Sequence, residues 1–403
     1  MPSHFSEIPD PRSPAPTNVA VEPEPSGKLR FNRNEWSGAF GDMGTDLPLL
    51  VGMILASGLD ATSVLTLFGL MQVATAITYR MPMPVQPLKA MAAIVIAQKL
   101  PPNILYGGGL AIGLSMLVLT ATGAIEWINR AVPKPVVRGI QCGLGLQLAG
   151  IALKDYVQAD GAAGLWLAGI GFLLTLILAG RKSVPTALVV ISLGAVYAFV
   201  FKRHDFDLAG IAGFHLPIWH QPTAVDVWTG FLALALPQIP LSIANSVLAT
   251  RQLAEDLFPE RRISAKRIGW TYSIMNLINP FFGGAPTCHG SGGMAGHYAF
   301  GGRTGGSVVI YGSMFVALGI LFGPGFQEVI QIFPLPILGV LLLFEAVTLL
   351  ALPRDLAAEK RDFVIAMLVA VICSALPYGY LAGLIIGVVC YQLTHRGLVR
   401  FGE

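Results

Sequence analysis

Two short stretches that disfavour helix interrupt a chain otherwise built from long apolar runs. Residues 82–87 read Pro-Met-Pro-Val-Gln-Pro, and residues 283–293 contain five glycines and one proline. Each is followed by an apolar run, 88–97 or 294–300, that is too short to cross a bilayer alone. Non-helical backbone at membrane depth must be buried in protein or line a cavity, because lipid cannot satisfy its N–H and C=O groups. Paired broken segments in the two halves of a chain therefore indicate the binding site of a transporter.

The composition indicates an integral membrane protein. Of 403 residues, 54% are hydrophobic and only 12% are charged, whereas average soluble domains carry about 25% charged residues. The net charge is +3 and the basic residues are scattered, so no nucleic-acid partner is expected. The chain has no Gly-x-Ser-x-Gly, His-Glu-x-x-His or Walker sequence. We therefore expect no enzymatic activity, no cofactor and no ATPase subunit.

The four cysteines give no sign of a disulfide framework or a metal site. Cys142, Cys288, Cys373 and Cys390 lie in or beside apolar segments, and their spacing fits neither pattern. We expect them to be buried as small hydrophobic residues. Cys288 differs from the others because it lies in the second broken stretch.

Apolar runs of about 18–23 residues mark membrane spans. They occupy residues 36–57, 61–79, 104–127, 136–153, 162–180 and 184–201, and then 228–249, 267–282, 305–323, 333–350, 362–376 and 378–394. The broken segments, 82–99 and 285–300, bring the predicted number to fourteen. An odd number of segments in each half inverts the second half in the membrane.

The predicted fold is thus an all-α membrane protein of two inverted seven-segment repeats. The repeats cover residues 34–201 and 228–396, joined by a connector at 202–227. Residues 1–33 are rich in Pro, Ser and Glu and are predicted to be a disordered tail. Residues 397–403 form a short C-terminal tail.

The distribution of Lys and Arg gives the orientation. With both tails in the cytoplasm, 21 of the 26 basic residues fall on the cytoplasmic side and four on the other, and Lys89 falls within a segment. Cytoplasmic loops of membrane proteins carry such an excess of positive charge. We therefore expect a multi-pass protein of the inner, or plasma, membrane with cytoplasmic N- and C-termini.

Four charged residues lie within the predicted segments, where charge is costly and usually functional. They are Asp42, Asp46, Lys89 and Glu345. Other interpretations stay open: the two aspartates could mark a helix end at the interface, and Lys89 could snorkel or form a structural pair. For Glu345, a buried pair with a purely structural role is also an open interpretation.

The second broken stretch has the features of an anion site. Gly290, Ser291, Gly292 and Gly293 precede a helix, and a helix start offers free N–H groups and a partial positive charge. Leu88 opens the matching half-helix of the first repeat, so the two starts are expected to face each other across a small anion. Additional donors are predicted to be Gln86, Lys89, Gln238, Thr287, His289 and the Asn245-Ser246 pair. In the first span, Gly38, Gly41 and Gly44 suggest close helix packing.

These motifs resemble the molybdate transporter family of plants, algae and bacteria, distant relatives of the SulP anion transporters. The matching stretches are residues 38–45 with 47–49, 83–90, 237–241 with 245–247, and 286–293 with 300–305. The resemblance implies a core domain of segments 1–4 and 8–11, a gate domain of segments 5–7 and 12–14, and a homodimer, as in SulP- and UraA-like transporters. The chain ends at Glu403, so the STAS domain usual in SulP proteins is not expected. Asp46 stands where an uncharged residue would be expected.

The expected function is secondary active transport of a tetrahedral oxyanion, with molybdate as the first choice. Sulfate has the same shape and charge, so a sulfate transporter of the same architecture is the nearest alternative. The sequence also leaves open an anion channel and a nucleobase carrier. For energy coupling we expect proton symport, with Glu345 protonated when the anion is bound. The structural alternative is a fixed ion pair between Glu345 and Lys89 or Arg138.

Overall fold

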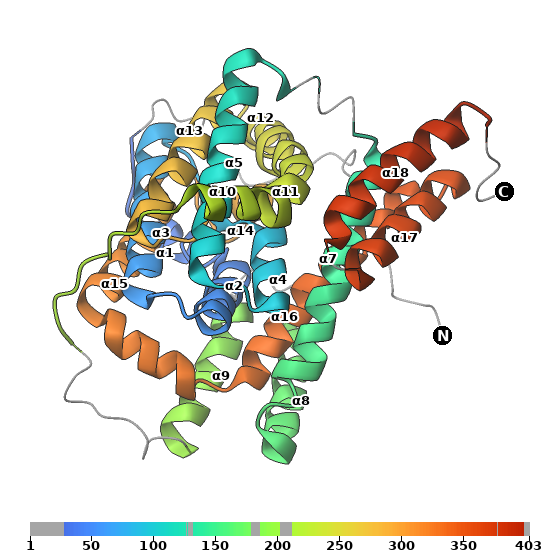
Figure 1. Cartoon of the computed structure of the whole chain (residues 1–403). Helices are drawn as coiled ribbons and strands as arrows, with labels where there is room; N and C mark the ends of the chain where they lie inside the picture. Colours follow the sequence, from blue (N-terminus) through green and yellow to red (C-terminus); the bar gives the residue numbers. More distant parts are fainter. Residues whose placement is uncertain are drawn as a thin grey trace, which may run out of the picture.

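The computed structural model describes residues 28–125, 127, 132–178, 186–201, 212–376 and 378–398. The described chain is almost entirely helical, with one pair of short strands (Figure 1). Most of the predicted N-terminal tail, the first part of the predicted connector and the end of the C-terminal tail lie outside the described residues.

The elements follow the order expected for two successive repeats. The first half contains α1 (Arg33–Gly38), α2 (Met43–Ser57), α3 (Ala61–Tyr79), β1 (Val85–Pro87), α4 (Lys89–Gln98), α5 (Pro102–Thr122), α7 (Lys134–Ile151), the π-helical turn η1 (Ala152–Tyr156), α8 (Gly161–Leu178) and α9 (Thr186–Phe201). The second half begins with one long helix made of α10 (Ala224–Gly230), η4 (Phe231–Ala235), α11 (Leu236–Leu241), η5 (Ser242–Ala249) and α12 (Thr250–Leu257). It continues with α13 (Ala265–Ile278), η6 (Asn279–Phe282), β2 (Thr287–His289), α14 (Ser291–Ala299), α15 (Gly306–Ile332), α16 (Leu335–Leu350), η7 (Leu352–Leu356), α17 (Lys360–Ala375) and α18 (Gly379–His395).

Each predicted segment contains at least part of one helix, and the helices differ in length. Among the described residues, seven helices are long and apolar enough to cross a membrane by themselves. They are Ala61–Tyr79, Pro102–Thr122, Lys134–Tyr156, Gly161–Leu178, Ala224–Leu257, Gly306–Ile332 and Leu335–Leu356. Several others, among them α2, α4, α9 and α18, are shorter apolar helices. The number of fourteen segments therefore stays a prediction.

The first predicted span, 36–57, was wrong as a single helix. The structure divides it into α1 and α2, with a turn between Gly38 and Met43. The turn allows very close packing: a Cβ atom on Gly38 would meet the backbone of Gly302, and one on Gly41 would meet the backbone of Gly296. The predicted role of these glycines in close packing is confirmed.

The helices form two groups, which we call the core helices (α1–α5 and α10–α15) and the gate helices (α7–α9 and α16–α18). In the core group, α3 packs along α15 and α5 packs along α13. The helix α3 in the first repeat is equivalent to α13 in the second, and α5 is equivalent to α15. The two pairs are therefore equivalent contacts, as inverted repeats require. In the gate group, α7 packs against α16, α17 and α18, and α8 packs against α16. Figure 1 shows α7, α8, α17 and α18 to one side of the α3, α5, α13 and α15 bundle.

The strands β1 and β2 join the two repeats at the centre of the core helices. They pair antiparallel, with Val85 opposite His289, Gln86 opposite Cys288 and Pro87 opposite Thr287. Each strand leads directly into a short helix, β1 into α4 and β2 into α14. Both predicted broken segments are thus confirmed as an extended stretch followed by a half-length helix.

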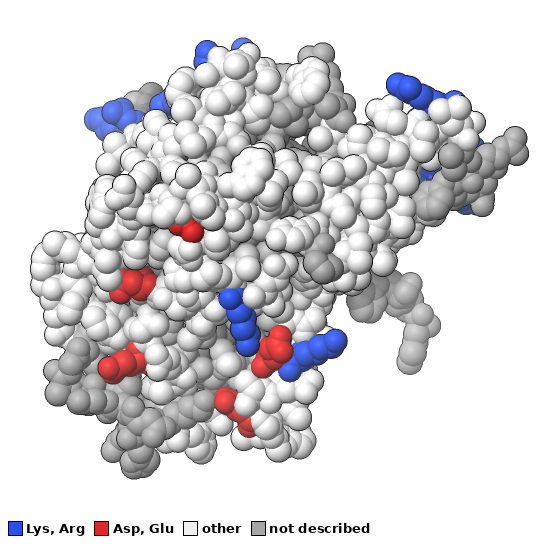
Figure 2. Space-filling view, viewed as in Figure 1, with Lys and Arg blue, Asp and Glu red and all other residues white. Residues whose placement is uncertain are grey.

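Charged side chains are unevenly distributed over the surface. In Figure 2, most of the visible Lys and Arg lie at the upper end of the molecule and at the outer end of α18, whereas most of the visible Asp and Glu lie in the lower half. The upper end carries the connection between α12 and α13, which includes Arg261 and Arg262.

Candidate functional site

The outer edge of each strand is held by a buried amide side chain from the preceding long helix. Gln72 of α3 donates to the carbonyl oxygen of Val85 (2.7 Å) and accepts from its N–H group (2.8 Å). Asn276 of α13 does the same for Thr287, at 2.6 and 2.9 Å. Each amide thus replaces a neighbouring strand, which satisfies non-helical backbone where water and lipid cannot.

These two amides were not predicted from the sequence, although a signal was present. Gln72 and Asn276 are polar residues inside apolar helices, and both side chains are fully buried. They occupy equivalent places in the two repeats, since α3 precedes β1 as α13 precedes β2. A buried amide in the helix that precedes a broken segment is therefore a sequence signal for this architecture.

Beside the strand pair lies a cavity of about 270 Å³ between the core and the gate helices. Its polar lining comes from Gln86, Lys89, Gln141, Gln238, Asn245, Ser246, Cys288, His289, Gly290, Ser291, Gly292, Glu345 and Thr348. Four leucines complete the wall: Leu144, Leu241, Leu349 and Leu352. The cavity therefore combines polar groups from β1, β2 and the helix starts with a mixed gate surface, in which Gln141, Glu345 and Thr348 lie beside three leucines.

The start of α14 faces this cavity with its N–H groups free. Within the described residues, no hydrogen bond links the N–H groups of Ser291, Gly292 or Gly293 to another group. A Cβ atom on Gly292 would meet no atom within 4 Å, so this residue borders open space. Unpaired N–H groups at a helix start attract anions.

The start of α4 is different, because the protein itself occupies its N–H groups. Leu88 donates to the carbonyl oxygen of Pro286 at 3.0 Å. The side-chain oxygen of Gln238 accepts from Ala90 (3.1 Å) and Met91 (3.3 Å). Both helix starts were expected to contribute N–H groups to the site, but those of Leu88, Ala90 and Met91 are used within the protein. The cavity is lined instead by the start of α14 and the Lys89 side chain.

Two polar contacts cross the cavity from core to gate. The Lys89 ammonium group forms an ion pair with the Glu345 carboxylate of α16, and both side chains are partly exposed, at 26% and 13%. Gln141 of α7 donates to Asn245 of η5 at 3.1 Å. Arg138, the other partner considered for Glu345, instead binds Asp355 with contacts of 2.7 to 3.2 Å.

The two aspartates of the first span lie inside the core helices rather than at an interface. Asp42 accepts from the Gln86 side chain at 2.6 Å, and Asp46 accepts from the hydroxyl of Tyr311 at 3.1 Å. Both carboxylates are buried, and neither lines the cavity. Asp42 therefore acts on the site through Gln86, whose amide it orients.

The predicted site residues thus fall into two groups. Those that line the cavity are Gln86, Lys89, Gln238, His289, Gly290, Ser291, Gly292 and Glu345. Those that lie behind the cavity wall are Leu88, Thr287 and Gly293. Thr287 is held by Asn276 and Asn279, and Gly293 packs against Asp42. The cavity-lining residues that were not predicted include Gln141 and Thr348 from the gate helices.

A family model described as "Molybdate transporter of MFS superfamily" matches residues 34–148 and 230–349, more than half of the chain. This chain belongs to the molybdate transporter family. It is 35% identical over 410 residues to Molybdate transporter 2 of Arabidopsis thaliana, covering 89% of this chain and 87% of that protein. It is 28% identical over 470 residues to Molybdate transporter 1 of Chlamydomonas reinhardtii, covering 87% and 90%.

Solved structures confirm the predicted fold class. The transmembrane domain of the cyanobacterial bicarbonate transporter BicA superposes with a TM-score of 0.66 at 16% identity, over 90% of this chain and 98% of that one. The murine Solute Carrier 26 family member A9 anion transporter, in its inward-facing state, gives 0.69 at 14% identity, over 93% and 70%. Although the family description names the MFS superfamily, the fold of this family member is of the SLC26 and SulP type.

Proposed function

We propose that this chain is a secondary active transporter of a tetrahedral oxyanion, and that the oxyanion is molybdate. The observation that carries the proposal is the cavity where the free start of α14 lies near the Lys89 ammonium group. The related proteins from Arabidopsis and Chlamydomonas are named molybdate transporters. Two structural neighbours are named a bicarbonate transporter and an anion transporter, which supports an anionic substrate.

The cavity is suited to a small dianion. Its volume of about 270 Å³ equals the liquid volume of roughly nine water molecules, enough for a five-atom oxyanion that keeps part of its hydration. N–H groups of Ser291 and Gly292 and the ammonium group of Lys89 supply donors on the core side. Charge-assisted hydrogen bonds of this kind are about twice as strong as neutral ones.

The shape and charge of the ligand are the basis for a direct test. Binding of molybdate, tungstate, sulfate, nitrate and uracil to the purified protein is measured by calorimetry. We expect similar affinities for molybdate and tungstate and no competition from nitrate. Tight sulfate binding with weak molybdate binding would support a sulfate transporter. Equal competition by nitrate would favour a weakly selective channel, and tight uracil binding would favour a nucleobase carrier.

Alternating access requires the core and gate helices to separate on one side of the site. The contacts that must break or exchange are the Lys89–Glu345 ion pair and the Gln141–Asn245 hydrogen bond. An anion that binds Lys89 competes with Glu345 for the same ammonium group. Substrate binding and the core–gate contact are therefore linked at one residue.

We propose proton symport as the source of energy. A dianion that enters a negative-inside cell moves against the voltage, at about 2.3 kcal/mol per charge per 100 mV, and an accompanying proton reduces this cost. Protonation of Glu345 would break its ion pair and release Lys89 for the anion. In reconstituted vesicles, Glu345→Gln should retain molybdate exchange but lose accumulation driven by a pH gradient. Accumulation that persists in this variant would exclude Glu345 as the proton carrier.

We also propose cytoplasmic termini, a location in the plasma membrane and a homodimer. The orientation is supported by the excess of basic residues in the predicted cytoplasmic loops and by the segregation of charge in Figure 2. Accessibility of single cysteines introduced at the two ends of the chain to a membrane-impermeant reagent tests the orientation. The mass of the purified protein, corrected for bound detergent, tests the dimer.

A further inference from the structure

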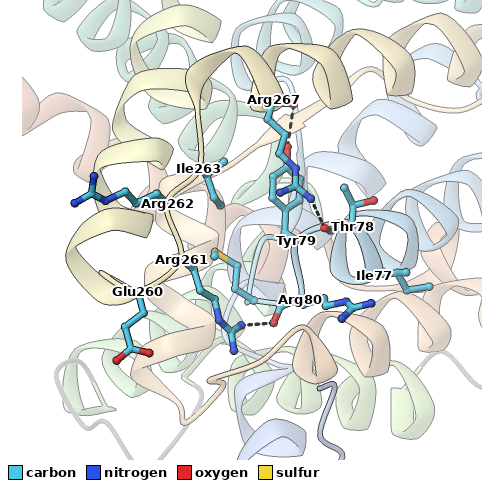
Figure 3. A pocket seen from close by; sticks show the side chains of 10 residues that line it. Ile77, Thr78, Tyr79, Arg80, Glu260, Arg261, Arg262, Ile263 and Arg267 are labelled. Atoms are coloured by element: carbon cyan, nitrogen blue, oxygen red, sulfur yellow. Dashed lines mark hydrogen bonds between the residues drawn. The ribbon is translucent and has the colours of Figure 1, made fainter. Parts of the chain in front are cut away.

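A second pocket, of about 570 Å³, lies at the C-terminal end of α3, away from the central cavity. Four arginines line it, Arg80, Arg261, Arg262 and Arg267, together with one acidic residue, Glu260. Figure 3 shows that they come from the end of α3, the connection between α12 and α13, and the start of α13. The pocket therefore has a strong excess of positive charge.

Two of these arginines have a structural role at the end of α3. Arg267 donates to the carbonyl oxygen of Thr78 and Arg261 to that of Arg80, each at 2.6 Å (Figure 3). The last carbonyl groups of a helix lack intrahelical partners and carry partial negative charge, so guanidinium groups stabilise them. The guanidinium group of Arg267 also lies 5.0 Å from the centre of the Tyr79 ring.

The other two arginines, Arg80 and Arg262, lack such a role. Both are exposed, and neither forms an ion pair within the described part of the chain. Arg80 also has a backbone φ of 55°, in the left-handed region, at the C-cap of α3. Glycine is preferred at such a position, and residues with a Cβ atom are disfavoured there. An arginine therefore stands at a position where the backbone favours glycine.

The surroundings of the pocket indicate what kind of anion fits. The pocket lies where a membrane-spanning helix ends, and Ile77, one turn earlier on α3, lines it with 55% of its surface exposed. Basic pockets between spanning helices at the membrane surface bind phospholipid headgroups. Arginine in particular matches the geometry of phosphate oxygens.

The pocket is distinct from the substrate cavity. Tyr79 forms part of its wall, and the edge of the Tyr79 ring packs against His289, with ring centres 5.4 Å apart. The Tyr79 hydroxyl is also hydrogen-bonded to Thr271 (2.6 Å), which in turn contacts His289 (2.7 Å). Since His289 lines the substrate cavity, these three side chains separate the two sites.

We propose that this arginine pocket binds a phosphate group, supplied by an anionic phospholipid headgroup or by a soluble phosphate. Arg80 and Arg262 supply positive charge from opposite sides of the pocket (Figure 3). Arg261 and Arg267 hold the pocket in shape through the end of α3.

The test measures the unfolding midpoint, Tm, of the purified protein. One arm titrates inorganic phosphate in uncharged detergent, with chloride used to keep the ionic strength constant. The other arm compares nanodiscs of phosphatidylcholine with nanodiscs that also contain phosphatidylglycerol. The pocket variant is Arg80→Gly with Arg262→Gln, in which glycine relieves the left-handed backbone and so preserves folding. The control, Arg354→Gln with Lys360→Gln, removes the same charge from two exposed residues outside the pocket.

We expect a saturable rise in Tm for the unmodified protein and for the control, and none for the pocket variant. A rise with inorganic phosphate assigns the site to a soluble ligand, and a rise only with phosphatidylglycerol assigns it to lipid. The proposal is overturned if the unmodified protein responds to neither ligand, or if the pocket variant responds as the control does.

Discussion

Replacement of Lys89 by methionine should sharply weaken molybdate binding. Lys89 is the cationic side chain that lines the cavity among the described residues, and its ammonium group pairs with Glu345 across it. Methionine keeps the length of the side chain but removes the charge and all three donors. The variant therefore leaves the carboxylate of Glu345 in the cavity without its partner.

The size of the effect follows from the contact that is lost. A hydrogen bond to a charged group contributes about 1.5–3 kcal/mol, and about 1.4 kcal/mol corresponds to a tenfold change in affinity. Loss of the Lys89 contact should therefore raise the Kd for molybdate roughly 10- to 150-fold. The Lys89→Met variant should bind molybdate more weakly than this loss alone predicts, because the unpaired Glu345 carboxylate repels a dianion.

A double variant separates binding from folding. Lys89→Met with Glu345→Gln removes both charges, so it should recover the stability that the single variant loses. Its molybdate affinity should stay at least tenfold below that of the unmodified protein, whereas Glu345→Gln alone should bind at least as tightly. Calorimetric titration of the purified proteins gives all four affinities. If the double variant binds molybdate within threefold of the unmodified protein, Lys89 is not a ligand.

Three further predictions concern the cavity wall and the strand supports. Gly292→Leu should fold, since a Cβ there points to open space, but should raise the Kd for molybdate at least tenfold; an unchanged Kd would place the anion elsewhere. In a variant that keeps only Cys288 of the four cysteines, saturating molybdate should slow alkylation by a small thiol reagent and nitrate should not; equal rates would contradict binding beside Cys288. Gln72→Leu should lower the free energy of unfolding by about 2–6 kcal/mol, because two buried backbone groups of Val85 lose their partners. The exposed control Gln252→Leu should change it little, and equal effects of the two substitutions would refute the role of the amide.

Much of this architecture was predictable because it depends on local chemistry. Proline and glycine disfavour helix wherever they occur, so both broken segments were visible in the sequence. Charge in an apolar segment is equally visible, and two such residues, Lys89 and Glu345, line the cavity. The sequence left open whether these two residues pair with each other, and the structure shows that they do.

Other features depended on contacts between distant residues. The N–H groups at the start of α4 are occupied by Gln238, which is about 150 residues away in the chain. Glycine opens α14 and not α4, but no local pattern shows that a side chain from another segment occupies the start of α4. The close approach of Gly41 to the backbone of Gly296 likewise joins the two repeats, and the first span alone does not reveal it.

The central claim is that the oxyanion binds between the start of α14 and Lys89. Tungstate is the most direct probe, because it has the shape and charge of molybdate and a strong anomalous X-ray signal. Crystals grown with tungstate should show an anomalous peak in the cavity, within hydrogen-bonding distance of the N–H groups of Ser291 and Gly292 and close to the Lys89 ammonium group. A cavity without a peak, with tungstate bound only at another site such as the arginine pocket, would contradict the account.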